Sequence, residues 1–399
     1  MMDDLIFLAH RIPYPPNKGD KIRSWHMLKY LAARYRVHLG CFIDDPQDQQ
    51  HKGALEAICA STCFVDLPVW KGRLRSVTAF VRNEPLSVAH YRDAGLTQWV
   101  EHVAAQHNPK GAVLYSSQTA LFLPPLVHAG ARTVMDFVDV DSDKWAQYAA
   151  RKSGPLKWLY AREANRLAHF EKAVAQQVDA CVLVSDQEAA LFRTIVPAAA
   201  DKIFGMSNGV DTEAFSPDRR FENPFSSGEQ AVVFTGAMDY WPNVDAVVWF
   251  ADHVWPKVIK ACPQAVFYIV GFKPAAEVQA LAGRPGLVVT GAVSDTKDYL
   301  AHAACAVAPL RVARGIQNKV LEAMAMALPV VASPQAAEGL AHVKEAELAV
   351  ADQPDTMAKA VIAVLTSTGG PDGAAARNRV MRDYAWEANL AVLDQLIAG

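Results

Sequence analysis

The sequence predicts an α/β protein with two parallel β-sheets that follow one another along the chain. Short, nearly continuous apolar runs alternate with longer helical patterns through most of the 399 residues, as in parallel sheets covered by helices on both faces. This alternation restarts after a polar, turn-rich stretch near residue 208. We therefore expect two open sheets in tandem, each binding ligands at the carboxyl ends of its strands.

The first half contains seven apolar runs that are expected to be strands: Leu5–His10, Val37–Ile43, Cys63–Leu67, Ala112–Ser116, Thr133–Phe137, Ala180–Ser185 and Ile203–Ser207. Helical patterns fill most of the gaps, including 23–34 and 160–177. Glu163 and Glu171 lie at helical spacing in the second of these patterns, and we expect them on a solvated face.

The second half contains six further runs: Ala231–Thr235, Val266–Val270, Leu287–Thr290, Cys305–Pro309, Pro329–Ala332 and Leu348–Ala351. The turn signals Asn208-Gly209 and Ser216-Pro217 mark a linker between the halves. The expected boundaries are 1–207, a linker at 208–229, a second domain at 230–376 and a C-terminal helix at 377–399. That helix either caps the second domain or crosses back onto the first.

Composition and charge narrow the class of protein. Hydrophobic residues make up 51% of the chain, and the formal net charge of −3 gives no reason to expect nucleic-acid binding. The six cysteines lack metal-binding or disulfide spacing, which favours reduced thiols. Two acids precede the short apolar run at the N-terminus, unlike a signal peptide, and we expect a cytoplasmic protein.

Residues 311–334, RVARGIQNKVLEAMAMALPVVASP, predict a polar loop, a helix and a buried strand. The first N–H groups of a helix have no partner and carry a positive partial charge, so a helix start favours an anion. Lys319 adds a positive charge there, and Glu322, one turn later, is placed to accept hydrogen bonds from a ribose. A sugar diphosphate bearing a ribose fits such a site.

Several of these stretches resemble GT-B glycosyltransferases, and in particular the retaining nucleotide-sugar transferases of family 4. The resemblance rests on Lys319-Val-Leu-Glu-Ala-Met-Ala, on Asn208-Gly-Val-Asp and on Phe234-Thr-Gly-Ala-Met-Asp-Tyr-Trp-Pro-Asn. The stretches 11–23 and 136–145 are similar to sugar transferases associated with exosortase/PEP-CTERM exopolysaccharide systems. The resemblance implies two Rossmann-like domains with a cleft between them, and a transfer that needs no metal or other cofactor.

The resemblance also implies roles for residues of the second domain. Lys319 would bind the donor diphosphate and Glu322 the ribose, with Asn318 and Gly236 beside them. Many relatives carry an acid eight positions before the second one, whereas this chain has Arg314 there, which would pair with a phosphate oxygen instead. Many relatives also have an arginine and a lysine after the strand that precedes Gly236, and this chain has neither.

In the first domain, the loop and helix after strand one are implied to face the donor phosphates and the acceptor. The candidates are His10, Lys18, Gly19 and Arg23, and Gly19 would let the backbone approach the reacting centre without a Cβ. A plain βα turn is the alternative, because Pro-Pro-Asn-Lys-Gly is good turn chemistry by itself.

An acidic cluster, Asp136-Phe-Val-Asp-Val-Asp-Ser-Asp, ends a buried strand. A transferase must take a proton from its acceptor, and a carboxylate can do so. Asp139 is the first candidate and Asp141 the second. The alternatives are an N-cap for the next helix or a magnesium site.

The sequence thus predicts a retaining transferase that uses a nucleotide-diphosphate sugar and a glycan or lipid-linked sugar acceptor. The alternating basic and apolar residues Lys71–Arg82 are either a peripheral membrane contact or an ordinary surface helix. Two rival functions are a GT-B nucleotide-sugar epimerase and a non-catalytic scaffold of an exopolysaccharide complex. No G-x-G-x-x-G follows strand one, which disfavours a dinucleotide-binding oxidoreductase.

Overall fold

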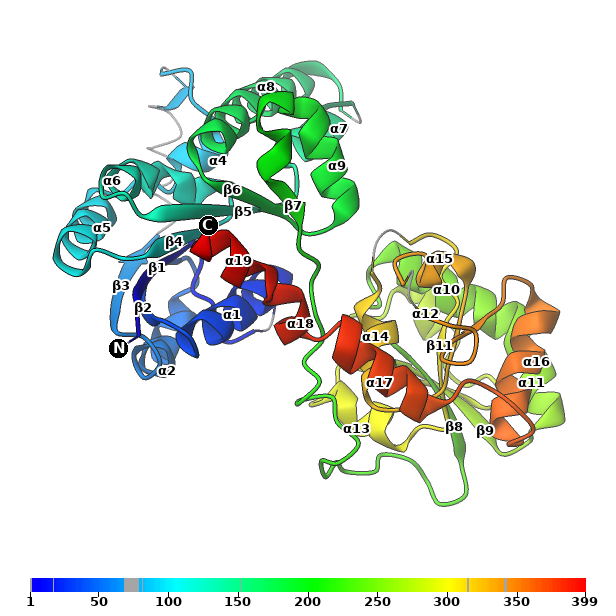
Figure 1. Ribbon diagram of the computed structural model, residues 1–399. Coiled ribbons are helices and arrows are strands. Elements are labelled where there is room, and N and C mark those ends of the chain that lie inside the picture. Colours follow the sequence, from blue (N-terminus) through cyan, green and yellow to red (C-terminus); the bar gives the residue numbers. More distant parts are fainter. Residues whose placement is uncertain are drawn as a thin grey trace. The chain divides into compact units, whose positions relative to one another are not determined.

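The computed structural model divides the chain into two compact units, which are described separately (Figure 1). Unit 1 contains Met1–Asn208 and Asn389–Gly399, and unit 2 contains Gly209–Ala388. The structure describes residues 2–16, 18–67, 79–80, 82–150, 152–313, 316–340 and 343–399. Most of the basic stretch 71–82, which the sequence marks for membrane contact, lies outside these residues.

Unit 1 has a seven-stranded parallel sheet with the order β3-β2-β1-β4-β5-β6-β7. The strands are β1(Asp4–Ala9), β2(Arg36–Ile43), β3(Ser61–Asp66), β4(Gly111–Tyr115), β5(Arg132–Val138), β6(Ala180–Leu183) and β7(Ile203–Gly205). The helices are α1(Gly19–Ala32), α2(Lys52–Glu56), α4(Leu86–Ala89), α5(Ala94–His107), α6(Leu123–His128), α7(Asp141–Ala150), α8(Gly154–Gln177), α9(Asp186–Ile195) and α19(Val392–Ala398), with short turns η1(Pro46–His51), η2(Ser117–Phe122) and η3(Pro197–Lys202).

Unit 2 has a six-stranded parallel sheet with the order β10-β9-β8-β11-β12-β13. The strands are β8(Gln230–Thr235), β9(Ala265–Val270), β10(Leu287–Gly291), β11(Cys305–Ala308), β12(Val330–Ala332) and β13(Ala349–Val350). The helices are α10(Trp241–Trp249), η4(Phe250–Val254), α11(Trp255–Ala261), α12(Ala276–Gln279), α13(Thr296–His302), α14(Asn318–Ala325), α15(Pro334–Ala337), α16(Pro354–Leu365) and α17(Gly373–Asp383). The short helix α18(Trp386–Leu390) spans the boundary between the two units.

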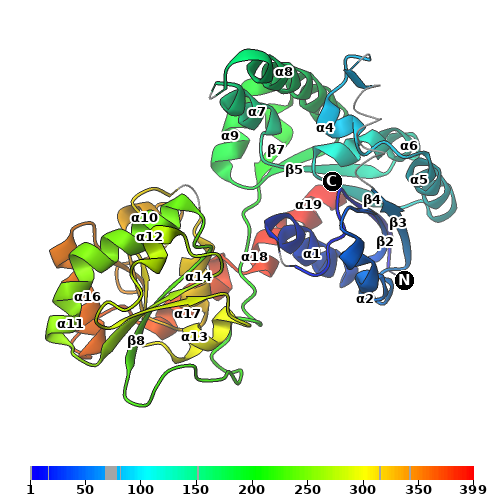
Figure 2. The same ribbon diagram turned by 180° about the vertical axis from the view of Figure 1, so that it is seen from behind.

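All thirteen expected strands occur, because each buried apolar run is short and ends in turn residues. Figure 2 shows helices on both faces of the sheets. Each unit has its own core, built around the buried faces of its strands. Within the described residues, no helix is long and apolar enough to cross a bilayer.

The end of the chain differs from the single helix expected at 377–399. It forms α17, α18 and α19, and residues 389–399 belong to unit 1. The return is held by side chains of unit 1. Arg132 Nε donates to Leu396 O at 2.7 Å, and Tyr30 Oη donates to Asp394 Oδ2 at 2.6 Å. The expected linker 208–229 falls within unit 2, apart from Asn208.

Candidate functional site

A cavity of about 370 Å³ lies at the carboxyl edge of the unit 2 sheet, and we call it the Lys319 pocket. It is bounded by the ends of β8, β9 and β10 and by the first turn of α14. Its lining residues are Thr235, Gly236, Ala237, Val270, Gly271, Phe272, Ala292, Val293, Thr296, Asn318, Lys319 and Glu322.

Lys319 is held at the pocket by two contacts from neighbouring elements. Its Nζ donates to Asn243 Oδ1 at 2.6 Å and lies 3.9 Å from the centre of the Phe234 ring. Burial lowers the pKa of Lys319 to about 7, although the nearby Glu322 carboxylate acts to raise it. Burial has the opposite effect on Glu322 and raises the pKa of its carboxyl group, while the charges of Lys319 and Lys297 act to lower it. The positive charge of Lys319 is therefore only partly compensated by Glu322, and a bound anion would supply further negative charge.

Two glycines allow the backbone to approach this amine. A Cβ on Gly236 would lie 2.7 Å from Asn243 Nδ2 and 3.0 Å from Lys319 Nζ. A Cβ on Gly271 would lie 1.7 Å from the carbonyl oxygen of Gly236, which is closer than any real contact. Both positions need glycine because a side chain at either one would displace the residues around Lys319.

The structure thus brings together four of the residues that the sequence predicts for donor binding: Gly236, Asn318, Lys319 and Glu322. Arg314 lies outside the described residues. Asn243 and Phe234 were missed, although both lie in the stretch that carried the resemblance. The early position of Asn243 in α10 was the available signal, because that helix follows the strand that leads to Gly236.

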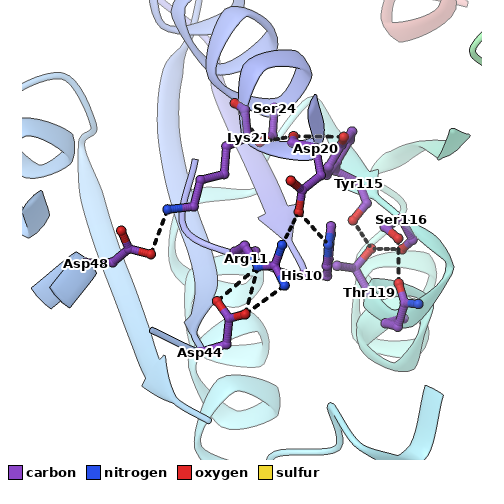
Figure 3. Close-up of polar contacts among 11 residues, drawn as sticks. His10, Arg11, Asp20, Lys21, Ser24, Asp44, Asp48, Tyr115, Ser116 and Thr119 are labelled. Carbon is purple, nitrogen blue, oxygen red and sulfur yellow. Dashed lines mark hydrogen bonds and ion pairs between the residues drawn. The ribbon is translucent and has the colours of Figure 1, made fainter. Parts of the chain in front are cut away.

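A polar cluster occupies the carboxyl end of β1 in unit 1 (Figure 3). Asp20 at the start of α1 lies 3.5 Å from His10 Nε2 and 2.5 Å from Arg11 Nη1, and Arg11 Nε also donates to Asp44 Oδ2 at 2.9 Å. Burial acts to raise the pKa of Asp20, but the His10 hydrogen bond and the Arg11 charge outweigh it and hold that pKa well below its usual range. Asp20 and Arg11 were missed as cluster members because no local pattern specifies how the nine-residue connection between them folds back.

The two candidate bases lie close together after β5. Lys144 forms an ion pair with Asp139, and its Nζ lies 3.8 Å from Asp141 Oδ1. Burial raises the pKa of Asp141, against the effect of Lys144. Asp141 is also the first residue of α7. The two roles considered for this acidic cluster, capping the helix and accepting a proton, therefore concern the same turn.

Arg23, one of the candidates on α1, is buried in unit 1. Its side chain is 1% exposed, and its Nε donates to Asp136 Oδ2 at 2.8 Å. Asp136 is fully buried, so this acid of the cluster pairs with Arg23 inside unit 1. The sequence places Arg23 one turn into α1 but does not show how deeply its side chain is buried.

Lys18 and Gly19 are exposed at the start of α1. Among the described residues, no atom outside the adjoining chain and the backbone of α1 lies within 4 Å of the place where a Cβ of Gly19 would be. The fold itself therefore does not require glycine at this position.

Comparisons with known proteins agree with this architecture. Residues 229–367 match the family model described as "Glycosyl transferases group 1". Among curated proteins, no sequence match was found.

Three solved structures are similar over nearly the whole chain. Sucrose-phosphate synthase from Thermosynechococcus elongatus is 16% identical with a TM-score of 0.62, covering 99% of this chain and 98% of that one. A glycosyltransferase from Rickettsia africae is 10% identical with a TM-score of 0.65, at 99% and 98% coverage. Anabaena HepE, solved in complex with UDP, is 13% identical with a TM-score of 0.62, at 100% coverage of both chains. The expected GT-B fold is therefore confirmed, and residues 229–367 are similar to group 1 glycosyl transferases.

Proposed function

We propose that this protein is a retaining glycosyltransferase that moves a sugar from a nucleotide-diphosphate sugar to a glycan or lipid-linked acceptor in exopolysaccharide biosynthesis. The observation that carries the proposal is the Lys319 pocket. A half-buried amine and a half-buried carboxylate lie one turn apart at the start of α14, at the carboxyl edge of a parallel sheet. The family match covers this pocket, and the HepE structure that contains UDP has the same fold.

The proposed roles follow from the charges in the pocket. The Lys319 ammonium and the first N–H groups of α14 stabilise the diphosphate as the bond between it and the sugar breaks. Glu322 accepts hydrogen bonds from ribose hydroxyls. The acceptor oxygen forms the new bond to the sugar, and its proton passes to a carboxylate.

A thermal-shift screen tests the donor class. The screen compares UDP-, GDP-, ADP- and dTDP-sugars, and we expect the donors of one nucleotide class to raise the Tm. Ligand at about 100 times its Kd adds about 2.7 kcal/mol of stability. UDP-sugars are the first choice. Failure of all four classes to shift the Tm would contradict the proposal. Incubation with the stabilising donor alone separates the rival activity, because an epimerase would isomerise the sugar without an acceptor.

Asp141 is proposed as the base, with Asp139 as the second candidate. Lys144 lies closer to Asp139 than to Asp141, and the raised pKa of Asp141 favours proton uptake. We expect Asp141→Asn to lower kcat about 10²-fold or more at unchanged donor affinity. Asp143→Asn is the matched control, because Asp143 lies in the same first turn of α7. Full turnover by Asp141→Asn and by Asp139→Asn would remove both acids from the mechanism.

A further inference from the structure

Three potential metal ligands meet at the amino edge of the unit 1 sheet. They are Asp4 at the start of β1, His38 near the start of β2 and His107 at the end of α5. One ligand atom from each residue lies within 4.8 Å of the other two. Three residues far apart in sequence therefore present one oxygen and two imidazole nitrogens to the same small volume.

His38 is the buried centre of this group, with 1% of its side chain exposed. Its Nε2 lies 2.9 Å from Asp4 Oδ1, and its Nδ1 lies 2.7 Å from Ser61 Oγ on β3. Burial lowers the pKa of His38, although the hydrogen bond to Asp4 acts to raise it. Both ring nitrogens of His38 are thus held by polar partners on the neighbouring strands β1 and β3.

His107 closes the open side of the group. Its ring centre lies 4.5 Å from that of His38, with 35° between the ring planes. Asn108 follows it with a φ of 44° and ends α5, so the position of His107 is fixed by a helix end. His107 is partly exposed, and this side gives an ion a path from solvent.

We propose that Asp4, His38 and His107 bind a zinc ion, with a water molecule as the fourth ligand. Two imidazoles and one carboxylate suit Zn²⁺, whereas Mg²⁺ and Ca²⁺ prefer sites made of oxygen ligands. His38 Nε2 would bind the ion, and the ring proton would reside on Nδ1, which donates a hydrogen bond to Ser61 Oγ. The Ser61 hydroxyl can donate or accept, so it holds the ring in both states and orients it for the metal.

The site is separate from the proposed transfer reaction. His10 follows the other end of β1, and six strand residues place it about 20 Å from Asp4. An ion at the amino edge would join β1, β2 and α5. It would stabilise unit 1 because it binds the folded state in preference to the unfolded chain. This inference does not depend on the proposed function, because none of the three ligands lies in the Lys319 pocket.

Arg36 is the charge that opposes the ion. Its Nη1 lies 3.6 Å from Asp4 Oδ1, and 46% of its side chain is exposed. Because the guanidinium competes for the same carboxylate, it must move into solvent when zinc binds. Removing its charge should therefore tighten the site.

The test measures Zn²⁺ bound to the purified full chain, using competition with a chromophoric chelator and a metal count after dialysis. We expect the unchanged protein to bind one ion per chain. His107→Ala should bind zinc at least about 100-fold more weakly, since loss of a residue that only holds a ligand in place already costs about 10–100-fold. Arg36→Gln should bind more tightly. His102→Ala is the matched control, because His102 is an exposed histidine on the same helix α5.

A second measurement distinguishes loss of this site from unfolding and from metal binding by the free cysteines. Bound Co²⁺ should give tetrahedral d–d bands without thiolate charge transfer, and His107→Ala should abolish them at an unchanged metal-free Tm. Ser61→Ala should weaken binding about 10- to 100-fold. Absence of binding, or equal zinc affinity in His107→Ala and His102→Ala, would overturn the proposal.

Discussion

Replacing Lys319 by alanine is expected to lower kcat/KM for the nucleotide sugar by about 10²- to 10³-fold, the usual cost of losing one group that stabilises developing charge. The amine is held beside Asn243 and Phe234, so its position is fixed before a ligand arrives. Loss of kcat would show that Lys319 acts on the departing diphosphate, and loss of affinity alone would show uniform binding. Steady-state kinetics with the donor found by the screen make this measurement.

The same lysine gives the reaction a pH dependence with a defined sign. Because its pKa is about 7, the free pocket loses its positive charge as the pH rises through that value. An anionic donor prefers the protonated amine, so the donor KM should rise between about pH 7 and pH 9, and donor binding should take up protons. Lys319→Ala should abolish that rise.

Stability should follow the opposite course in the free protein. The lysine of the unfolded chain keeps a pKa near 10.5, so the unfolded state binds more protons between pH 7 and that value, and stability increases with pH in this range. Lys319→Met should therefore raise the Tm near neutral pH while activity falls. Lys257→Ala, an exposed lysine on α11, controls for the general loss of a charge. Kinetics near normal in Lys319→Ala would place the diphosphate elsewhere.

The sequence was informative where a local pattern determines the outcome. Strand positions follow from short apolar runs, and α14 follows from a loop that leads into a helical pattern. The cluster at Lys319 could be predicted because Lys319 and Glu322 are one turn apart on a single helix. Asn243 joins them only through the packing of α10 beside the sheet, and no local pattern specifies that contact.

Buried acids show where local patterns mislead. Glu163 and Glu171 were expected on a solvated face, and this was wrong, since they are 2% and 0% exposed. Glu163 accepts hydrogen bonds from Leu86 N and Ser87 N, both at 2.9 Å, and Glu171 accepts one from Ser142 Oγ at 2.5 Å. Each carboxylate satisfies the start of a distant helix, so its burial depends on tertiary contacts that helical spacing cannot reveal.

Breaking the Arg23–Asp136 pair is expected to have the largest effect on stability. Arg23 Nε donates to Asp136 Oδ2 at 2.8 Å, and its Nη1 donates to Met206 O at 2.8 Å and Asn208 Oδ1 at 2.9 Å. The side chain thus joins α1 to β5 and to the segment after β7. Arg23→Ala leaves a buried carboxylate without its partner, which typically costs about 3–5 kcal/mol of unfolding free energy.

A double replacement distinguishes the pair from simple loss of packing. Arg23→Met with Asp136→Leu removes both charges while keeping apolar volume, and such exchanges are often neutral or stabilising. We expect the double variant to recover most of the unfolding free energy lost in Arg23→Ala, measured by denaturant titration. Lys29→Ala, an exposed position on the same helix, should change little. If Arg23→Ala were as stable as Lys29→Ala, the pair would contribute no net stability, and Arg23 would again be a candidate for contact with substrate.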